Sequence, residues 1–327
     1  MRRLAVALFL LTLAAGFWAH AWLDQPLRLR EAVVDLTIAP GTNARQVASQ
    51  AAQAGVEVLP LAMQVWFRLS GQAHQIQAGV YELRTGVTPR SLLAKLVSGE
   101  QALRQVTLVE GWTFAQVRQA LLRSPDLKPA SQGLTESALM ANLGRPGSAA
   151  EGRFFPDTYR YAKNSADLEV LAAALSAMDR QLEQVWQARD EGLALSNPDE
   201  LLTLASLVEK ETGLATDRGM IARVFHNRLL RGMPLQSDPT VIYGLGVAFD
   251  GNLRRPDLRR DTAWNTYTRA GLPVTPIAMP GRAALLAAAQ PASGSALYFV
   301  SRGDGSSEFS ETLEAHNRAV NRFQRRQ

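Results

Sequence analysis

The chain of 327 residues contains no cysteine, which excludes disulfide bonds, thiol catalysis and cysteine-ligated zinc. Histidine is scarce as well, and its positions are too dispersed to indicate a metal cluster: His20, His74, His226 and His316. Lysine occurs only at Lys95, Lys128, Lys163 and Lys210. So few lysines argue against a pyridoxal-phosphate enzyme, which needs a Schiff-base lysine. We therefore expect no metal and no other cofactor.

Positive charge nevertheless exceeds negative charge, and arginine supplies most of it. The 35 basic and 30 acidic residues give a net charge of +5 and a pI of about 9.8. Such a balance suits an anionic polymer or a membrane surface. The arginines are scattered and no nucleic-acid motif is present, so we expect no nucleic-acid partner. A GxSxG nucleophile elbow is also missing, which leaves only a non-local Ser/His/Asp triad open.

Long hydrophobic runs are limited to the N-terminus. Leu4 to Leu23 holds about 20 residues without an acid, arginine or lysine, enough for a helix to cross ~30 Å of hydrocarbon. Arg2 and Arg3 precede this run and predict a cytoplasmic N-terminus. We expect residues 1–23 to anchor the chain, with the rest outside the cytoplasm. The alternative is a cleaved signal peptide, because 19–21 (Ala-His-Ala) imitates a small-x-small cleavage site.

The remainder has the composition of a globular protein and room for two or three domains. Three segments share a short strand, a glycine turn and an amphipathic helix: 36–47, 81–92 and 106–117. Gly41, Gly86 and Gly111 make the turns, and Thr42, Thr88 and Thr113 or their neighbours are candidate N-caps. The pattern resembles the strand-turn-helix half of a LysM module, a peptidoglycan-binding fold. The alternative is a small α+β domain that only spaces a catalytic part from the membrane.

The segment 201–213 predicts a helix with two acidic side chains beside its apolar face. The apolar arc comprises Leu201, Leu202, Leu204, Ala205, Leu207 and Val208, and the opposite side carries Thr203, Ser206 and Lys210. Glu209 and Glu211 fall at the two shoulders of the arc. A carboxyl group held against apolar neighbours keeps its proton near neutral pH, as a general acid needs. The alternative is that both are helix-end charges or members of ion pairs.

Further elements are predicted in the second half of the chain. A long helix spans 168–189, another starts at Thr216 or Asp217, and a short one runs from Asp238 to Gly244. A hairpin turns at 303–305, and a last helix covers 312–323.

Motifs along nearly the whole chain resemble the MltG/YceG-like endolytic murein transglycosylases. They are FFPDTY (154–159), VEKET (208–212), RVFHNRL (223–229), LQSDPTVIYG (235–244), WNTYTRAGLPVTPIAMPG (264–281), LYFV (297–300) and HN (316–317). Motifs of this length in this order are highly specific. The chain is therefore identified as a candidate member of that family.

The resemblance implies a fold, a location and a reaction. The fold class is α+β, with a transmembrane anchor (1–23), a LysM-like α+β region (32–125) and a YceG-like catalytic domain (126–327). It implies a single-pass inner-membrane protein with a periplasmic catalytic domain that works beside penicillin-binding synthases. It also implies a lyase that cuts MurNAc-β-1,4-GlcNAc bonds within nascent glycan strands and leaves 1,6-anhydro-MurNAc ends.

The catalytic glutamate of the family carries over to Glu211, with Glu209 as the possible second acid. Candidate glycan-binding residues lie in the following loops: Gln236, Ser237, Asp238, Tyr243, Asn265, Thr266 and Tyr267. Asp238 could instead serve only as a helix cap. The competing function is a non-catalytic peptidoglycan-binding or scaffold protein, in which both glutamates are structural.

Overall fold

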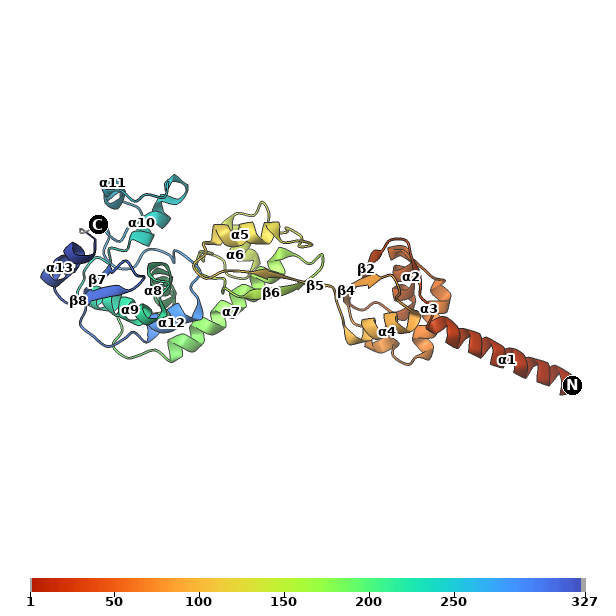
Figure 1. Ribbon diagram of the computed structural model, residues 1–327. Coiled ribbons are helices and arrows are strands. Elements are labelled where there is room, and N and C mark those ends of the chain that lie inside the picture. Colours follow the sequence, from red (N-terminus) through yellow and green to blue (C-terminus); the bar gives the residue numbers. More distant parts are fainter. Residues whose placement is uncertain (1, 325–327) are drawn as a thin grey trace. The chain divides into compact units, whose positions relative to one another are not determined.

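The computed structural model describes residues 2–324, which fall into two compact units. Unit 1 comprises residues 1–104 with 161–165, and unit 2 comprises residues 105–160 with 166–327. Both units combine helices with short strands (Figure 1), so the fold is mixed α+β, as predicted.

Helix α1 (Arg2–Leu23) occupies the segment predicted as a membrane anchor. Met1 lies outside the described residues, as do the side chains of several positions between 2 and 15. Within the part of the chain that the structure describes, no helix has the length and apolarity needed to cross a membrane. The end of α1 is attached to unit 1, because Leu23 is buried and the Arg90 guanidinium donates to both oxygens of Asp24 at 2.7 and 3.2 Å.

Besides α1, the described part of unit 1 contains two small antiparallel sheets and three further helices. Strand β2 (Val33–Ile38) pairs with β4 (Gly79–Arg84), and β1 (Arg28–Leu29) pairs with β3 (Val56–Glu57). The helices are α2 (Ala44–Ala54), α3 (Pro60–Leu69) and α4 (Pro89–Ser98), with a 3₁₀ turn η1 (Ala73–Gln75). Alternate residues of β2 are buried, as expected for a strand with one face on the core. That core contains Leu36, Val47, Met63, Phe67, Tyr81, Leu83 and Leu92.

The three predicted strand-turn-helix segments form, and their glycines have the left-handed backbone that such turns require. Gly41, Gly86 and Gly111 have φ of +79°, +95° and +75°. The N-caps are Asn43, next to the predicted Thr42, and then Thr88 and Thr113. The third segment lies in unit 2, because the units divide after residue 104, whereas the predicted domain boundary follows residue 125.

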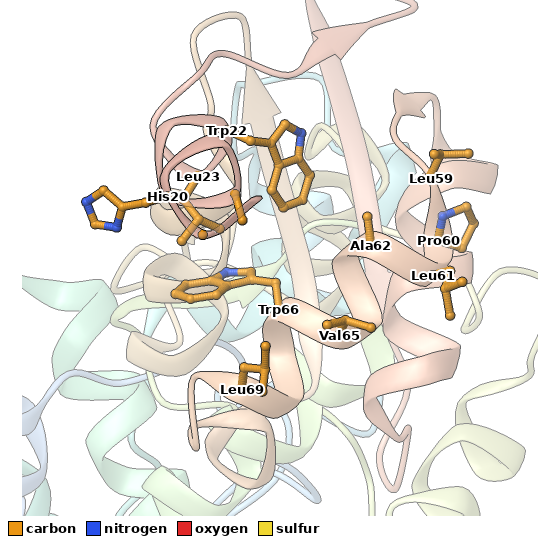
Figure 2. Close-up of a pocket in the computed structure, with 12 residues that line it drawn as sticks. His20, Trp22, Leu23, Leu59, Pro60, Leu61, Ala62, Val65, Trp66 and Leu69 are labelled. Atoms are coloured by element: carbon orange, nitrogen blue, oxygen red, sulfur yellow. The ribbon is translucent and has the colours of Figure 1, made fainter. Parts of the chain in front are cut away.

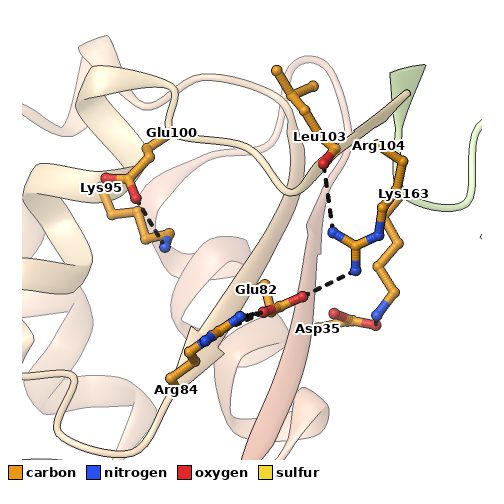
Figure 3. Close-up of polar contacts among 8 residues, drawn as sticks. All are labelled: Asp35, Glu82, Arg84, Lys95, Glu100, Leu103, Arg104 and Lys163. Carbon is orange, nitrogen blue, oxygen red and sulfur yellow. Dashed lines mark hydrogen bonds and ion pairs between the residues drawn. The ribbon is translucent and has the colours of Figure 1, made fainter. Parts of the chain in front are cut away.

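A polar cluster in unit 1 ties the returning segment 161–165 to the sheet (Figure 3). Asp35 and Glu82 lie directly opposite each other on β2 and β4, a pairing of like charges that is unfavourable alone. The Lys163 ammonium contacts Asp35 at 2.8 Å, and the Arg104 guanidinium contacts Glu82 at 3.2 Å. Arg84 also donates to Glu82, and together the two arginines lower the pKa of that carboxyl group. The cations therefore offset the repulsion between the strands.

Unit 2 is mainly helical. Its first part holds α5 (Phe114–Arg123) and α6 (Glu136–Asn142), and β5 (Leu103–Thr107) pairs with β6 (Thr158–Ala162) where the chain passes between the units. The larger part holds α7 (Asp167–Gln187), α8 (Pro198–Glu211), α9 (Ala215–Leu230), α10 (Asp238–Leu245), η2 (Gly246–Ala248), α11 (Arg255–Arg259) and α12 (Arg282–Ala289). It closes with the antiparallel hairpin β7 (Tyr298–Ser301) and β8 (Ser307–Ser310), followed by α13 (Leu313–Phe323), as predicted.

Helix α8 lies at the centre of unit 2 and packs against α7, α9 and α12. Asn197 caps it by accepting from the Glu200 N–H at 3.0 Å, and Pro198 occupies its first turn. Every residue from 201 to 208 is buried, so the predicted polar side of the helix is wrong for Thr203 and Ser206. The Ser206 hydroxyl is satisfied internally, since it donates to the Thr203 carbonyl at 2.7 Å and accepts from the Ile277 N–H at 3.0 Å.

Candidate functional site

Glu211 is the last residue of the buried helix α8, and its side chain reaches a pocket in unit 2. The Ser237 hydroxyl donates to Glu211 Oε1 at 2.5 Å. The pKa of Glu211 is raised to about 7, chiefly by burial; the Ser237 hydrogen bond and the charge of Arg228 lower it in part, and the negative charge of Asp238 adds to the rise. A carboxyl group with this pKa can both donate and accept a proton near neutral pH.

The pocket has a volume of about 440 Å³ and is formed by residues far apart in the sequence. Its polar lining includes Glu211, Arg228, Gln236, Asp238, Tyr267 and His316. They come from α8, α9, the segment that leads into α10 and its first residue, the loop after α11, and α13. The hairpin β7–β8 adds Phe299 and Ser301. The structure thus gathers Glu211 with three of the predicted glycan-binding side chains, and with Ser237 as the hydrogen-bond donor to the acid.

Gln236 has a positive φ of 51°, which is uncommon for a residue other than glycine. Its N–H donates to the Thr266 carbonyl at 3.1 Å, and the Ser237 N–H donates to Thr266 Oγ1 at 3.0 Å. Tyr267 donates its hydroxyl proton to Asp238 Oδ1 at 2.5 Å. Backbone strain held by surrounding hydrogen bonds is typical of functional loops, and here it presents Gln236 to the pocket.

Asn265 and Thr266 are buried, and their polar groups are engaged within the protein. Asn265 Nδ2 donates to the Leu258 and Arg260 carbonyls at 3.1 and 2.7 Å, and Oδ1 accepts from the Tyr267 N–H at 2.8 Å. Thr266 Oγ1 also lies 2.9 Å from Thr240 Oγ1. Both side chains therefore hold the loop that carries Tyr267 rather than line the pocket.

Tyr243 lies elsewhere in unit 2, against a second buried acid that the sequence reasoning did not single out. Its hydroxyl donates to Glu151 Oε2 at 2.9 Å, and its ring meets Trp264 edge to face at 5.3 Å. The Phe114 N–H donates to both oxygens of Glu151 at 3.0 and 3.1 Å. Burial raises the pKa of Glu151 to about 7. The only sequence signal for Glu151 is its place just before the FFPDTY motif.

Glu209 points to a different partner from Glu211. Its Oε2 accepts from the Gly281 N–H at 2.9 Å, and burial raises its pKa. It does not line the pocket that contains Glu211. The two acids of this helix thus have separate surroundings, as their position on opposite shoulders of the apolar arc predicts.

Arg228 and His316 line the pocket but were not predicted as site residues. The Arg228 guanidinium is buried, donates to the Leu297 and Leu235 carbonyls at 2.7 and 2.8 Å, and lies over the Tyr298 ring at 5.3 Å. The His316 ring stacks on the same tyrosine at 5.2 Å, and its buried Nδ1 has no hydrogen-bond partner. Arg228 could have been found from spacing, because it follows Ile221 by seven positions on the apolar face of α9.

Comparisons with known proteins agree with this architecture. The YceG-like family model matches residues 36–322. An endolytic murein transglycosylase of Bacillus subtilis is 31% identical over 310 residues, covering 89% of this chain and 84% of the relative. One from Streptococcus pneumoniae D39 is 28% identical over 352 residues, covering 94% of this chain and 62% of the relative.

A solved structure has the same fold. The crystal structure of a YceG-like protein from Listeria monocytogenes aligns with a TM-score of 0.56 and 24% identity, covering 88% of this chain and 98% of that one. The family match spans most of both units and includes every residue of the pocket lining up to Val320. The chain therefore belongs to the YceG-like family.

Proposed function

We propose that this chain is an endolytic murein transglycosylase in which Glu211 is the single catalytic acid and base. Its family membership and its relatives, which carry that name, support the activity. The observation that supports the role of Glu211 is a buried carboxyl group, with a pKa of about 7, at the wall of a pocket of about 440 Å³. The substrate is the glycan strand of peptidoglycan.

The proposed reaction needs one titrating group. Protonated Glu211 donates its proton to the oxygen that bridges MurNAc C1 and GlcNAc C4, and the C1–O bond breaks. The N-acetyl group of the substrate stabilises the positive charge that develops at C1. The Glu211 carboxylate then takes the proton of the C6 hydroxyl as O6 bonds to C1, which forms the 1,6-anhydro ring. Each turnover thus restores the proton on Glu211 and consumes no water.

This reaction does not require a second catalytic carboxylate, and the side chains around Glu211 agree with a mechanism that uses one acid. Ordinary glycosidases place two carboxyl groups about 5 to 9.5 Å apart across the bond that they cleave. Glu209 is turned to Gly281 and does not line the pocket. Asp238 does line it, but its carboxylate accepts from Tyr267, and its charge raises the pKa of Glu211. Asp238 therefore helps to keep the proton on Glu211.

The remaining pocket side chains provide glycan contacts. Gln236, Asp238 and Tyr267 offer an amide, a carboxylate and an aromatic ring to sugar hydroxyls and faces. Ser237 tunes the acid. Asn265 and Thr266 support the binding loop, and Tyr243 supports α10 through Glu151.

We infer a periplasmic catalytic domain on an inner-membrane anchor. The apolar run of 4–23, with Arg2 and Arg3 before it, supports an anchor over 1–23. The strand-turn-helix segments support a LysM-like glycan-binding region over 32–125 before the catalytic domain of 126–327. An enzyme that cuts nascent strands acts where they are polymerised, so penicillin-binding synthases are the expected partners.

Mass spectrometry of purified glycan strands, digested by the full chain in detergent, tests the activity. The native chain is expected to produce 1,6-anhydro-MurNAc ends. Glu211→Gln keeps the side-chain shape but removes the titrating proton, so cleavage is expected to fall by about 10²- to 10⁴-fold. The matched variant Glu209→Gln should retain most of the cleavage.

Three results would contradict the proposal. Uncut strands after incubation with the native chain would indicate a binding or scaffold protein. Undiminished cleavage by the Glu211→Gln variant would remove Glu211 from the chemistry. An inactive Glu209→Gln variant beside an active Glu211→Gln variant would exchange the two roles.

A further inference from the structure

Helix α3 in unit 1 is apolar on two opposite faces. Met63 and Phe67 are fully buried in the core of the unit. On the other side, Leu61, Val65 and Leu69 recur every four residues and are 70%, 46% and 79% exposed. A surface helix of a globular domain normally turns polar residues to water, so an exposed apolar stripe of this length indicates a binding surface.

This stripe forms one wall of a groove of about 710 Å³, and the end of α1 forms the other (Figure 2). Trp22 and Leu23 of α1 face Trp66 and Val65 of α3 across it, and Leu59 and Leu61 extend the apolar wall. Among the described residues that line the groove, none is an acid, an arginine or a lysine. We name the wall of this groove that Leu59, Leu61, Val65 and Leu69 form the α3 face.

The direction of α1 relative to the α3 face is fixed by contacts within unit 1. Arg90 at the start of α4 holds Asp24, the residue after α1, and its guanidinium also lies 6.0 Å from the Trp66 ring. Trp66 Nε1 donates to the Pro89 carbonyl at 3.2 Å. The groove is therefore a built feature rather than a chance gap between two independent segments.

The exposed apolar residues of α1 lie next to the positions of this helix that line the groove, Gly16, Ala19 and His20. Phe17 and Trp18 are both 77% exposed, and Phe9, Leu10, Leu11 and Leu13 continue the same apolar surface. Because the two surfaces are continuous, a medium that covers the end of α1 also reaches the α3 face. Tryptophan and arginine at the edge of an apolar segment are typical of the boundary between acyl chains and headgroups.

We propose that the α3 face is a membrane-contact surface, which lies in the headgroup and acyl-chain boundary of the bilayer that α1 enters. This inference rests on the proposed anchor. Leu61, Val65 and Leu69 insert as the apolar face of an interfacial helix, while Met63 and Phe67 keep the helix attached to unit 1. Unit 1 is thereby held against the lipid surface by two elements instead of a single tether.

The absence of cysteine permits a direct test on the full chain. Single cysteines at Leu61, Val65 and Leu69 would carry a nitroxide label in vesicles of phosphatidylethanolamine and phosphatidylglycerol. Collision of the label with oxygen, which enters lipid, is compared with collision with a nickel chelate, which stays in water. Leu13 serves as the reporter of the anchor, and Glu100, exposed at the end of α4, as the reporter of water.

We expect the three labels on α3 to favour oxygen severalfold over the nickel chelate, as the label at Leu13 does, while the label at Glu100 favours nickel. Labels on α3 that resemble Glu100, beside a lipid-exposed Leu13, would overturn the inference and leave the anchor intact. A water-exposed Leu13 would overturn the anchor and the inference together. Labels on α3 that are shielded from both reagents, or coupled between copies, would assign the face to a protein and overturn the inference.

A double variant tests whether the apolar side chains, rather than the label, cause the insertion of α3. Leu61→Ser with Leu69→Ser should shift the label at Val65 toward nickel, because the insertion loses two of its apolar side chains. Leu103→Ser with Leu122→Ser is the matched control, since both leucines are 50% exposed and lie outside the groove. An equal shift in the control would contradict the inference.

Discussion

Burial raises the pKa of two glutamates in unit 2 that have different surroundings. Burial raises the pKa of both Glu151 and Glu211 to about 7. Glu151 accepts from the Phe114 N–H and from the Tyr243 hydroxyl, and it lies outside the lining of the pocket. Glu211 accepts from the Ser237 hydroxyl and lines the pocket.

A raised pKa alone therefore does not identify a catalytic acid. Both side chains are desolvated, yet the oxygens of Glu151 are enclosed by donors from α5 and α10, which ties two elements together. Glu211 terminates its helix at an open volume where a sugar oxygen can approach. Both glutamates have a raised pKa, so it is access to a substrate that indicates a catalytic role for Glu211 and a structural role for Glu151.

Glu151→Gln gives the sharpest separation of the two acids. The pKa of Glu151 is about 7 in the folded chain, against an ordinary value of 4.5. The folded state therefore binds this proton more tightly than the unfolded state does. The stability that protonation of Glu151 contributes to the fold is fully present below pH 4.5 and is lost as pH rises through 7. At ~1.4 kcal/mol per pKa unit, the loss is on the order of 3 kcal/mol.

The neutral variant Glu151→Gln should remove this loss, so its unfolding free energy should match the native value at pH 4 and exceed it by up to about 3 kcal/mol at pH 8. Urea unfolding across this pH range measures the difference. Glycan cleavage should stay within a few-fold of native, unlike that of Glu211→Gln. A well-folded Glu151→Gln variant without cleavage would give Glu151 a part in the reaction and contradict its structural role.

Ser237→Ala tests whether the proton of Glu211 limits the rate. The Ser237 hydroxyl favours the carboxylate form of Glu211, so its loss raises the pKa of the acid. The alkaline limb of the cleavage rate against pH should move upward by about one to two pH units, because a hydrogen bond to a charged group is worth roughly 1.5 to 3 kcal/mol. Ser237→Thr retains a hydroxyl and is the matched control, with an expected limb close to native.

Asp238→Asn should move the same limb in the opposite direction. The charge of Asp238 raises the pKa of Glu211, and asparagine removes this charge while it can still accept from the Tyr267 hydroxyl. The limb should fall by a fraction of a pH unit, because the charge is only one contribution beside burial. Cleavage rates of Asp238→Asn and Ser237→Ala, measured side by side at several pH values, give the direction of each shift. Shifts of the same sign for Asp238→Asn and Ser237→Ala would mean that a different group titrates.

Local patterns in the sequence predicted the elements and the placement of the acids on α8. Thr88, Thr113 and Thr312 mark helix starts by the chemistry of capping, which needs only neighbouring residues. The apolar arc placed Glu209 and Glu211 on separate shoulders, and the structure gives them separate partners. Such features depend on residues within one or two turns, so periodicity captures them.

Contacts between segments far apart in the sequence could not be predicted from local patterns. Periodicity assigns one buried side to a helix, whereas α8 is enclosed by α7, α9 and α12, which buries Ser206 as well. Tyr243 has the composition of a sugar-binding residue, but its hydroxyl meets Glu151, 92 positions earlier in the chain. Asn265 likewise reads as a polar loop residue until its carbonyl partners are known. Tertiary packing decides which polar side chains remain available.

The smallest effect is expected where a pocket residue contributes binding but no proton. The Tyr267 hydroxyl donates to Asp238, and both side chains line the pocket. Tyr267→Phe keeps the aromatic ring but no longer holds the Asp238 carboxylate in place for the sugar, so KM should rise roughly 2- to 10-fold while kcat stays nearly constant.

Tyr159→Phe removes a hydroxyl that donates to the Phe155 carbonyl, away from the pocket lining, and serves as the matched control with native kinetics. Steady-state kinetics on glycan strands of defined length measure both variants. A large fall in kcat for Tyr267→Phe at constant KM would place its hydroxyl in the transition state. The pocket would then hold a second reacting group, and the contrast between one accessible acid and one enclosed acid would no longer suffice to explain the site.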